Sequence, residues 1–299
     1  MTRTLIGTLL ICLLHPAVAA SQQDALTSAS PDARVAAAPL QEATGLLSQY
    51  VAEGRIAGAV AAIARDGQLA YFESVGYQDL EAQTPMTAQS LFRIYSMTKP
   101  VTAVAVMMLN QEGHFQLSDP VSTYLPEFDD VRVLSGSDGR LRPPVRPITI
   151  QDLLLHTSGL SHRTSELYRQ DGVRSRTDDL PTFVSKIVRS PLMEDPGGRF
   201  RYSEATTVLG RLVEVWSGQR LDDFMEERIF RPLGMIDTGF SVDATQASQL
   251  ATVYRSGAGP LTPVEIEEIP FTEVPALLEG AVGLVSTVPE ATVDPGFLD

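Results

Sequence analysis

The sequence predicts an α+β fold, in which an antiparallel sheet is flanked by helices and joined to a large, mostly helical lobe. Three observations support it. A β-hairpin pattern stands near the N-terminus, residues 115–235 contain helices and loops, and strand-like runs return after residue 240. A helical insertion between strands indicates two lobes, with the chemistry in the cleft between them.

The first elements of the predicted domain are a helix, a hairpin and a buried helix. Residues 43–53 carry apolar side chains at helical spacing. Residues 58–76 contain two strand-like runs on either side of Asp66-Gly67, a dipeptide typical of a tight hairpin turn. The next run, over about residues 97–110, is apolar nearly all round, which indicates a buried helix.

Helices and loops fill the middle of the chain, and we find no convincing strand run between residues 115 and 235. A short helix that closes into a Ser-Gly turn is predicted within residues 148–160. An amphipathic helix is predicted within residues 200–218, ending at a glycine. Its apolar face comprises Val208, Leu209, Leu212, Val213 and Trp216. Strand-like pieces then return, including residues 281–287.

The composition indicates an ordinary globular protein that does not bind nucleic acid. The chain has 299 residues, a net charge of -14 and 43% hydrophobic residues. It contains no basic patch that would attract phosphate backbones. A chain of this length can bury a large core, as one domain or as two lobes of one unit.

The first 20 residues have the pattern of a Sec-type signal peptide. One positive charge at Arg3 precedes a short apolar run, and small residues follow up to Ala20. The apolar run is too short to span a bilayer, and its Cys12 lacks the small preceding residue of a lipoprotein site. We therefore expect an exported protein, periplasmic or secreted, with no stable membrane insertion after cleavage and no disulfides. The expected organisation is a signal peptide at 1–20, a flexible leader at 21–43, the domain at 44–289 and an atypical tail at 290–299.

Ser96 and Lys99 stand three residues apart at the start of the predicted buried helix, which places them on one face. Only two of the 23 basic residues are lysines, and Lys, unlike Arg, can give up its proton near neutral pH. Desolvation in an apolar helix lowers the pKa of a lysine, and the neutral amine can then take the proton of a serine. The alternative is an ordinary helix start, with Ser96 as an N-cap and Lys99 extending to solvent.

Tyr202 is the candidate third member of this site, because a phenol can share a proton with a lysine. It precedes the amphipathic helix, whose N-terminal end would stabilise a phenolate; the alternative is a core or rim aromatic. The chain has no G-x-S-x-G motif and no glycine-rich phosphate loop after a strand. His114, His156 and His162 are wrongly spaced for zinc, and we interpret His156 as a turn-stabilising side chain. We expect no metal and no cofactor.

Four stretches, in this order, resemble the β-lactamase-related serine hydrolases, which include class C β-lactamases, family VIII carboxylesterases and D-alanyl-D-alanine peptidase relatives. They are LFRIYSMTKPVTAVAVMML, PITIQDLLLHTSGL, PGGRFRYSEATTVLGRLVE and RIFRPLGMIDTGF. The resemblance runs from about residue 44 to about residue 289. It implies a β-lactamase/transpeptidase-like fold, with Ser96 as the acylated nucleophile, Lys99 as its proton partner and Tyr202 as the second base.

The sequence departs from this family in two places. The family's β-lactamases have Asn two residues after the tyrosine, where this chain has Glu204. A carboxylate at that substrate-binding position would disfavour β-lactam carboxylates, which favours an esterase-like enzyme. The family's third motif, K/H-T-G or W-G-G on an inner strand, does not follow residues 281–287. We therefore expect a sheet that is incomplete at the C-terminus, with an unpaired edge that favours self-association.

Two hypotheses follow from the sequence. The first is an exported serine hydrolase that forms an acyl-enzyme on Ser96 and acts on a small ester, amide or β-lactam. The second is an inactive or weakly active truncated homologue that uses its cleft to bind a ligand.

Overall fold

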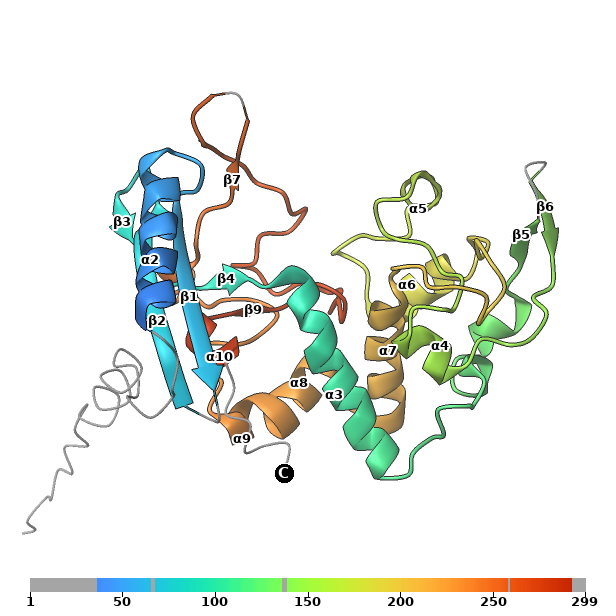
Figure 1. Ribbon diagram of the computed structural model, residues 1–299. Coiled ribbons are helices and arrows are strands. Elements are labelled where there is room, and N and C mark those ends of the chain that lie inside the picture. The colour runs from blue at the N-terminus through green and yellow to red at the C-terminus, as the bar shows by residue number, and fades with distance from the viewer. Residues whose placement is uncertain (1–36, 66–67, 136–138, 258, 292–299) are drawn as a thin grey trace, which may run out of the picture.

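The chain forms two lobes on either side of a central helix, as a computed structural model shows (Figure 1). The structure describes residues 37–65, 68–135, 139–257 and 259–291. Helix α3 (Thr98–Gln111) lies between a lobe built from the N-terminal strands and a second, mostly helical lobe. The predicted α+β fold with a large helical lobe is therefore confirmed.

The first lobe is built on a three-stranded antiparallel sheet in the order β1-β2-β3. Its elements are α2 (Ala37–Ala52), β1 (Gly58–Arg65), β2 (Gln68–Asp79) and β3 (Thr84–Pro85). β1 and β2 pair from Gly58 opposite Gly76 to Arg65 opposite Gln68, with a register shift after Ile63. Gly76 has a φ of +74°, and an added Cβ would lie 2.4 Å from the Ala57 carbonyl oxygen, so this position requires glycine.

Short strands bring distant segments of the chain together near the N-terminal end of α3. β4 (Phe92–Arg93), just before the predicted nucleophile, pairs antiparallel with β9 (Val285–Ser286). A second small pair joins β7 (Tyr254–Arg255) to β8 (Thr262–Pro263) above the first lobe (Figure 1). Of the strand-like run predicted at 281–287, only two residues form a strand.

The second lobe is assembled from short helices around α3 and α7 (Ala205–Ser217). The other α-helices of the described residues are α4 (Ile150–Leu154), α5 (Glu166–Gln170), α6 (Leu180–Ile187), α8 (Leu221–Met225), α9 (Arg231–Leu233) and α10 (Val288–Ala291). Of these, α10 packs against β1 of the first lobe. The chain also forms short 3₁₀ helices at η2 (Tyr95–Met97), η3 (Val121–Thr123), η4 (Pro126–Asp130) and η6 (Ala247–Gln249). η5 (Glu226–Phe230), between α8 and α9, is a π-helix.

The core lies mainly in the helical lobe, where the predicted apolar face of α7 is buried. Val208, Leu209, Leu212 and Val213 are buried against the residues of α3. Trp216 is partly buried and stacks on Phe115, with ring centroids 3.9 Å apart. The helix ends where the sequence predicted, because its final glycine takes a left-handed φ of +71°.

Three sequence expectations need correction or lie outside the described residues. α2 begins at Ala37, so residues 37–43 of the expected leader are helical. The middle of the chain does contain a hairpin, β5 (Val133–Ser135) with β6 (Arg140–Arg142); strands of three residues are too short to show alternation. The signal peptide, the Asp66-Gly67 turn and residues 292–299 lie outside the described part. Within that part, no helix has the length and apolar character needed to cross a bilayer.

Candidate active site

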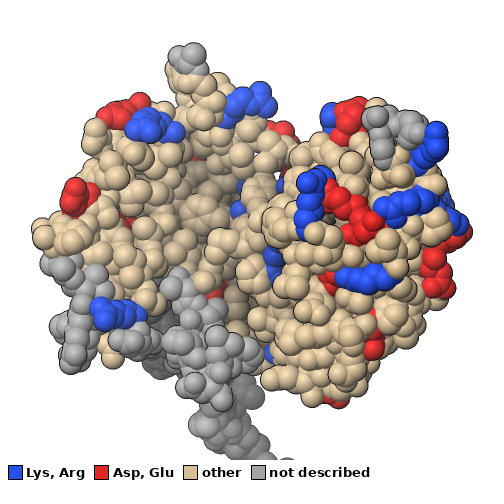
Figure 2. Space-filling model, turned by 45° about the vertical axis from the view of Figure 1, so that its right-hand side comes forward, with Lys and Arg blue, Asp and Glu red and all other residues tan. Residues whose placement is uncertain are grey.

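The predicted nucleophile Ser96 is exposed. The surface of the molecule is hollowed between the two lobes (Figure 2). Ser96 sits in the turn η2, which leads directly into α3. The preceding residue, Tyr95, has a φ of +42°, which is rare for a residue with a side chain. Backbone strain of this kind is frequent at functional sites, and here it accompanies the sharp turn that carries the serine.

Ser96, Lys99 and Tyr202, the three predicted catalytic residues, come together in the structure. The Tyr202 phenol donates a hydrogen bond to Ser96 Oγ over 2.8 Å, and Lys99 Nζ donates to the same oxygen over 3.4 Å. Lys99 Nζ also donates to the Ala281 carbonyl oxygen over 2.9 Å and lies 4.6 Å from the centre of the Tyr202 ring. The serine hydroxyl is therefore within reach of two groups that can exchange protons with it.

The electrostatics of the site make Tyr202 easier to ionise than a free tyrosine. Burial raises the pKa of Tyr202, but Lys99 and Ser96 together lower it by more, so the pKa lies below its ordinary value of 10.0. Their hydrogen bonds and the ammonium charge both stabilise the phenolate. Tyr202 is therefore the better placed of the two partners to accept the serine proton.

His156 holds the segment that carries Tyr202. Its backbone carbonyl accepts from Arg201 N over 2.7 Å, and its Nδ1 accepts from Ser203 N over 3.3 Å. Burial, together with the charge of Lys99, lowers the pKa of His156 to about 4, so the ring is neutral at neutral pH. The structure thus agrees with the prediction that His156 stabilises a turn, and the turn is the one that positions Tyr202.

Helix α4 supports His156 through a buried carboxylate. Asp152 accepts two hydrogen bonds from the Arg146 guanidinium, at 2.5 and 2.9 Å, and one from the Thr157 hydroxyl at 2.9 Å. It also forms a capping box with Thr149 at the start of the helix. These bonds fix the turn that follows α4 and explain why the sequence places an acid inside a short apolar helix.

Residues 280–284 complete the site, and sequence reasoning did not assign them to it. The Thr102 hydroxyl donates to the Gly280 carbonyl over 2.8 Å, and Leu284 N donates to Thr98 Oγ1 over 3.1 Å. Gly280 leaves room for this approach, because an added Cβ would lie 2.7 Å from the Thr206 carbonyl oxygen. The available signal was the pair Thr98 and Thr102, two polar residues one turn apart in an apolar helix.

Glu204, the predicted substrate-binding residue, is buried and only 2% exposed. Its carboxyl accepts a hydrogen bond from the Thr207 hydroxyl over 3.1 Å. Burial and the nearby Glu279 carboxylate raise its pKa, although Arg163 and Lys99 oppose the shift. The structure therefore places no exposed carboxylate of Glu204 in the cleft, and its contact with substrate stays a prediction.

The sequence of the chain is similar to that of known hydrolases. The family model described as Beta-lactamase matches residues 43–290. Esterase EstB of Burkholderia gladioli is 36% identical over 278 residues, which cover 90% of this chain and 66% of EstB. Protein Rv1367c of Mycobacterium tuberculosis is 36% identical over 244 residues, which cover 78% of this chain and 60% of that protein. The chain therefore spans less than two thirds of the length of either relative.

Solved structures of similar fold include EstCE1 and the simvastatin synthase LovD. EstCE1, described as a hydrolase with promiscuous acyltransferase activity, superposes with a TM-score of 0.74 at 30% identity, over 84% of this chain and 70% of EstCE1. The simvastatin synthase LovD of Aspergillus terreus superposes with a TM-score of 0.71 at 26% identity, over 86% of this chain and 67% of LovD. Both likenesses cover more than four fifths of this chain.

Proposed function

This chain belongs to the β-lactamase-related serine hydrolases, and we propose that it cleaves small esters or amides through an acyl-enzyme formed on Ser96. One observation carries the proposal. Ser96 Oγ accepts hydrogen bonds from both Tyr202 Oη and Lys99 Nζ, at 2.8 and 3.4 Å. A nucleophile, a base and a group that stabilises the base are the minimum that acyl transfer to a serine requires.

The first half of the reaction forms the acyl-enzyme. Ser96 Oγ attacks the substrate carbonyl while its proton passes to the Tyr202 phenolate, which Lys99 stabilises. The oxyanion that forms lies near the N-terminal end of α3, where the helix dipole is positive. When the tetrahedral intermediate collapses, the bond to the leaving group breaks, and Tyr202 returns the proton to the departing alkoxide or amine.

The second half repeats these steps with water. Tyr202, again a phenolate, takes a proton from a water molecule, whose oxygen attacks the acyl carbon. Collapse of this intermediate breaks the bond to Ser96 Oγ, and the proton returns from Tyr202 to the serine. The products are a carboxylic acid and the free enzyme.

The surroundings of the serine support an esterase-like enzyme. Met97 is 57% exposed and Phe200 is 65% exposed, and the Phe200 ring packs edge-on against His156, which neighbours Tyr202. These side chains give the mouth of the site an apolar rim, which suits the hydrocarbon part of a small ester. The similarity to EstB, an esterase, and to EstCE1, a hydrolase, supports the same proposal.

Labelling with a fluorophosphonate tests the proposal directly. We expect the wild-type chain to be labelled and Ser96→Ala not to be, while Ser256→Ala, a change at another exposed serine, keeps the label. Turnover of a p-nitrophenyl ester should fall by about 10³-fold or more in Ser96→Ala, as for other serine nucleophiles. Labelling that survives Ser96→Ala, or that never appears in a folded wild-type protein, would exclude the mechanism.

Export is a separate part of the proposal and rests on residues 1–20 alone. The positive residue, the apolar run and the small residues before position 21 support cleavage by a signal peptidase. N-terminal sequencing of protein recovered outside the cytoplasm should give a mature end close to Ser21. A full-length protein that stays in the cytoplasm would contradict it.

A further inference from the structure

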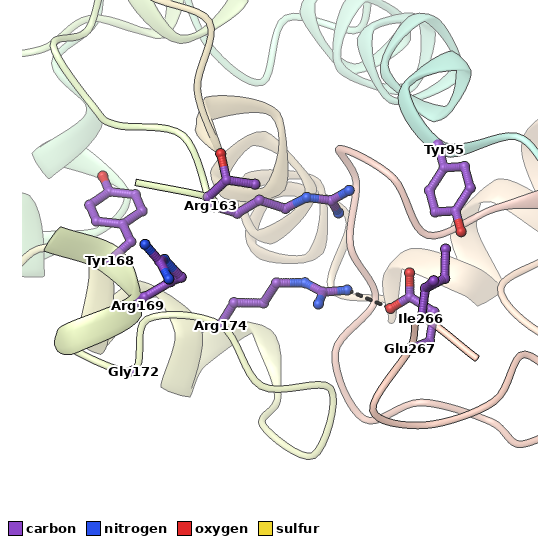
Figure 3. A pocket seen from close by; sticks show the side chains of 9 residues that line it. Tyr95, Arg163, Tyr168, Arg169, Gly172, Arg174, Ile266 and Glu267 are labelled. Atoms are coloured by element: carbon purple, nitrogen blue, oxygen red, sulfur yellow. Dashed lines mark hydrogen bonds and ion pairs between the residues drawn. The ribbon is translucent and has the colours of Figure 1, made fainter. Parts of the chain in front are cut away.

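A second feature of the cleft is a pocket of about 750 Å³ beside the nucleophile (Figure 3). One wall is Tyr95, which directly precedes Ser96 in the chain. The helical lobe contributes Arg163 and Arg174, and the loop that follows β8 contributes Glu267. Ser96 itself does not line the pocket, but it is bonded to Tyr95, so the pocket and the nucleophile adjoin at this residue.

The cationic groups of the pocket differ in how they are neutralised. Arg174 pairs with Glu267 at 2.9 Å and with Glu279 at 2.6 Å, and Arg169 pairs with its helix neighbour Glu166. Arg163 forms no ion pair with any residue that the structure describes. Glu267, Arg169 and Arg174 therefore line the pocket beside the guanidinium of Arg163, and the charges of these lining residues sum to a positive value.

Two donors in the pocket lack acceptors. Arg163 Nη1 and the Tyr95 hydroxyl are both buried, and neither has a hydrogen-bond partner among the described residues. Buried polar groups in folded proteins are nearly always satisfied, so an unsatisfied one calls for an explanation, such as a ligand. Figure 3 shows the Arg163 side chain extending across the pocket toward the side on which Tyr95 stands.

The chemistry of these donors selects an anion. A guanidinium presents a planar fork of N–H groups that matches the two oxygens of a carboxylate, and a phenol adds a further donor. The acids nearby do not oppose it, because Glu267 already receives Arg174 at 2.9 Å and Arg176 at 3.7 Å. Lys99, four residues after Tyr95 in the chain, does not line the pocket but adds positive charge near it.

We propose that Arg163 and Tyr95 form a subsite for a carboxylate carried by the substrate, so that the enzyme prefers esters or amides with an acidic end. This rests on the proposed hydrolase function and deepens it. It also reverses the expectation that the cleft rejects anions, which assumed an exposed carboxylate at Glu204. The structure buries Glu204, and Arg163 Nη1 has no hydrogen-bond partner among the described residues.

The test compares two substrates that differ only at the end of the acyl chain. Mono-p-nitrophenyl glutarate ends in a carboxylate, whereas p-nitrophenyl valerate ends in a methyl group. We expect the wild-type chain to show the higher kcat/KM for the glutarate ester. Arg163→Gln should lower the glutarate-to-valerate ratio by about 10- to 100-fold, which is the value of a hydrogen-bonded charge pair. Tyr95→Phe should lower the ratio less.

Two further variants separate a built subsite from a diffuse positive field. Arg169→Gln removes a guanidinium from the same pocket that is already paired with Glu166, and it should leave the ratio unchanged. Arg163→Lys keeps the charge without the fork and should give an intermediate ratio. An equal loss in Arg169→Gln and Arg163→Gln, or no change of the ratio in Arg163→Gln, would overturn the proposal.

If neither ester is turned over, that result counts against the proposed hydrolase function but not against the subsite. A binding measurement then tests the subsite by itself. Free glutarate should raise the melting temperature of the wild-type chain and of Ser96→Ala, but not that of Arg163→Gln. Inorganic phosphate at the same concentration serves as the comparison anion. Equal stabilisation by both anions, or stabilisation that survives Arg163→Gln, would show that no carboxylate subsite exists there.

Discussion

The phenol of Tyr202 lies 2.8 Å from Ser96 Oγ, although 106 residues separate the two along the chain. The contact exists because α3 and α7 pack side by side, so that the segment entering α7 meets the segment entering α3. His156 and the 280–284 segment hold the two sides in place. The predictions below address the proton chemistry of this contact and the groups that support it.

Lys99→Arg should lower kcat of a neutral ester by about 10²- to 10⁴-fold, the usual contribution of an acid–base group. Arg keeps the positive charge, but its planar fork does not fit the Lys99 contacts with Ser96 and Ala281, so the Tyr202 phenolate would lose the group that stabilises it. The matched control is Lys186→Arg, since Lys186 pairs with Asp178 on the surface of the other lobe. Steady-state kinetics measure the effect, and equal activity in the two variants would show that Lys99 does not support Tyr202 through these contacts.

The activity should rise with pH as Tyr202 ionises. Because the pKa of Tyr202 lies below 10.0, the acidic limb of kcat/KM against pH should turn over below that value. Tyr202→Phe should remove this limb and most of the activity, whereas Tyr77→Phe, on β2, should keep both. A pH profile unchanged in shape by Tyr202→Phe would show that another group is the base.

His156 should make the protein less stable in mild acid. Its pKa is lowered to about 4, against 6.5 for the free side chain. At pH values between about 4 and 6.5 the imidazole is therefore protonated in the unfolded chain but neutral in the folded chain. The free energy of unfolding should therefore fall as the pH drops from about 6.5 to about 4. His156→Gln should flatten this dependence in chemical denaturation, whereas the exposed His114→Gln should leave it unchanged. Parallel curves for wild type and His156→Gln would contradict the assignment.

Glu204 should have the opposite effect on the pH dependence of stability, and destabilise the protein as the pH rises. Its pKa is raised by burial and by Glu279, so the folded chain holds a proton more tightly than the unfolded chain does, and stability should fall as the pH rises above 4.5. Glu204→Gln removes the ionisable group and should raise the melting temperature more at pH values above neutral than in acid. Glu265→Gln, at an exposed position, should show no such dependence. A Gln variant that loses stability at high pH would mean that the carboxylate form is the one the fold requires.

We also predict that the chain self-associates through β1. Among the described residues β1 pairs only with β2, and Ile63 on this strand is 42% exposed. An unpaired edge with apolar side chains is a template for another strand, and a charge on the edge blocks it. Size-exclusion chromatography with light scattering should show dimers or larger species that Ile63→Lys reduces and Leu141→Lys, on β6, does not. A monomer at all concentrations would refute this.

Local patterns predicted much of the fold because they depend on near neighbours. The paired strands within residues 58–76, the apolar face of α7 and its glycine end follow from periodicity and from the chemistry of helix ends, and the structure contains all three. Ser96 and Lys99 could be paired from their spacing, since residues three apart share a helix face. The role of Tyr202 was implied by family resemblance rather than by spacing.

Tertiary structure alone decided the charges of the site, because ionisation depends on burial and on neighbours that are distant in sequence. Glu204 reads as an acid facing the substrate, yet packing of α7 buries it beside Glu279. Arg163 is one of many arginines in the sequence. Only the fold shows that Arg174 pairs with Glu267 and Glu279, whereas Arg163 forms no ion pair within the described part of the chain and shares a pocket with Tyr95. The sequence by itself thus indicated which residues are candidates for the chemistry, while the packing of the two lobes decided which of them are buried and which partners surround them, because burial and long-range contacts depend on the whole fold.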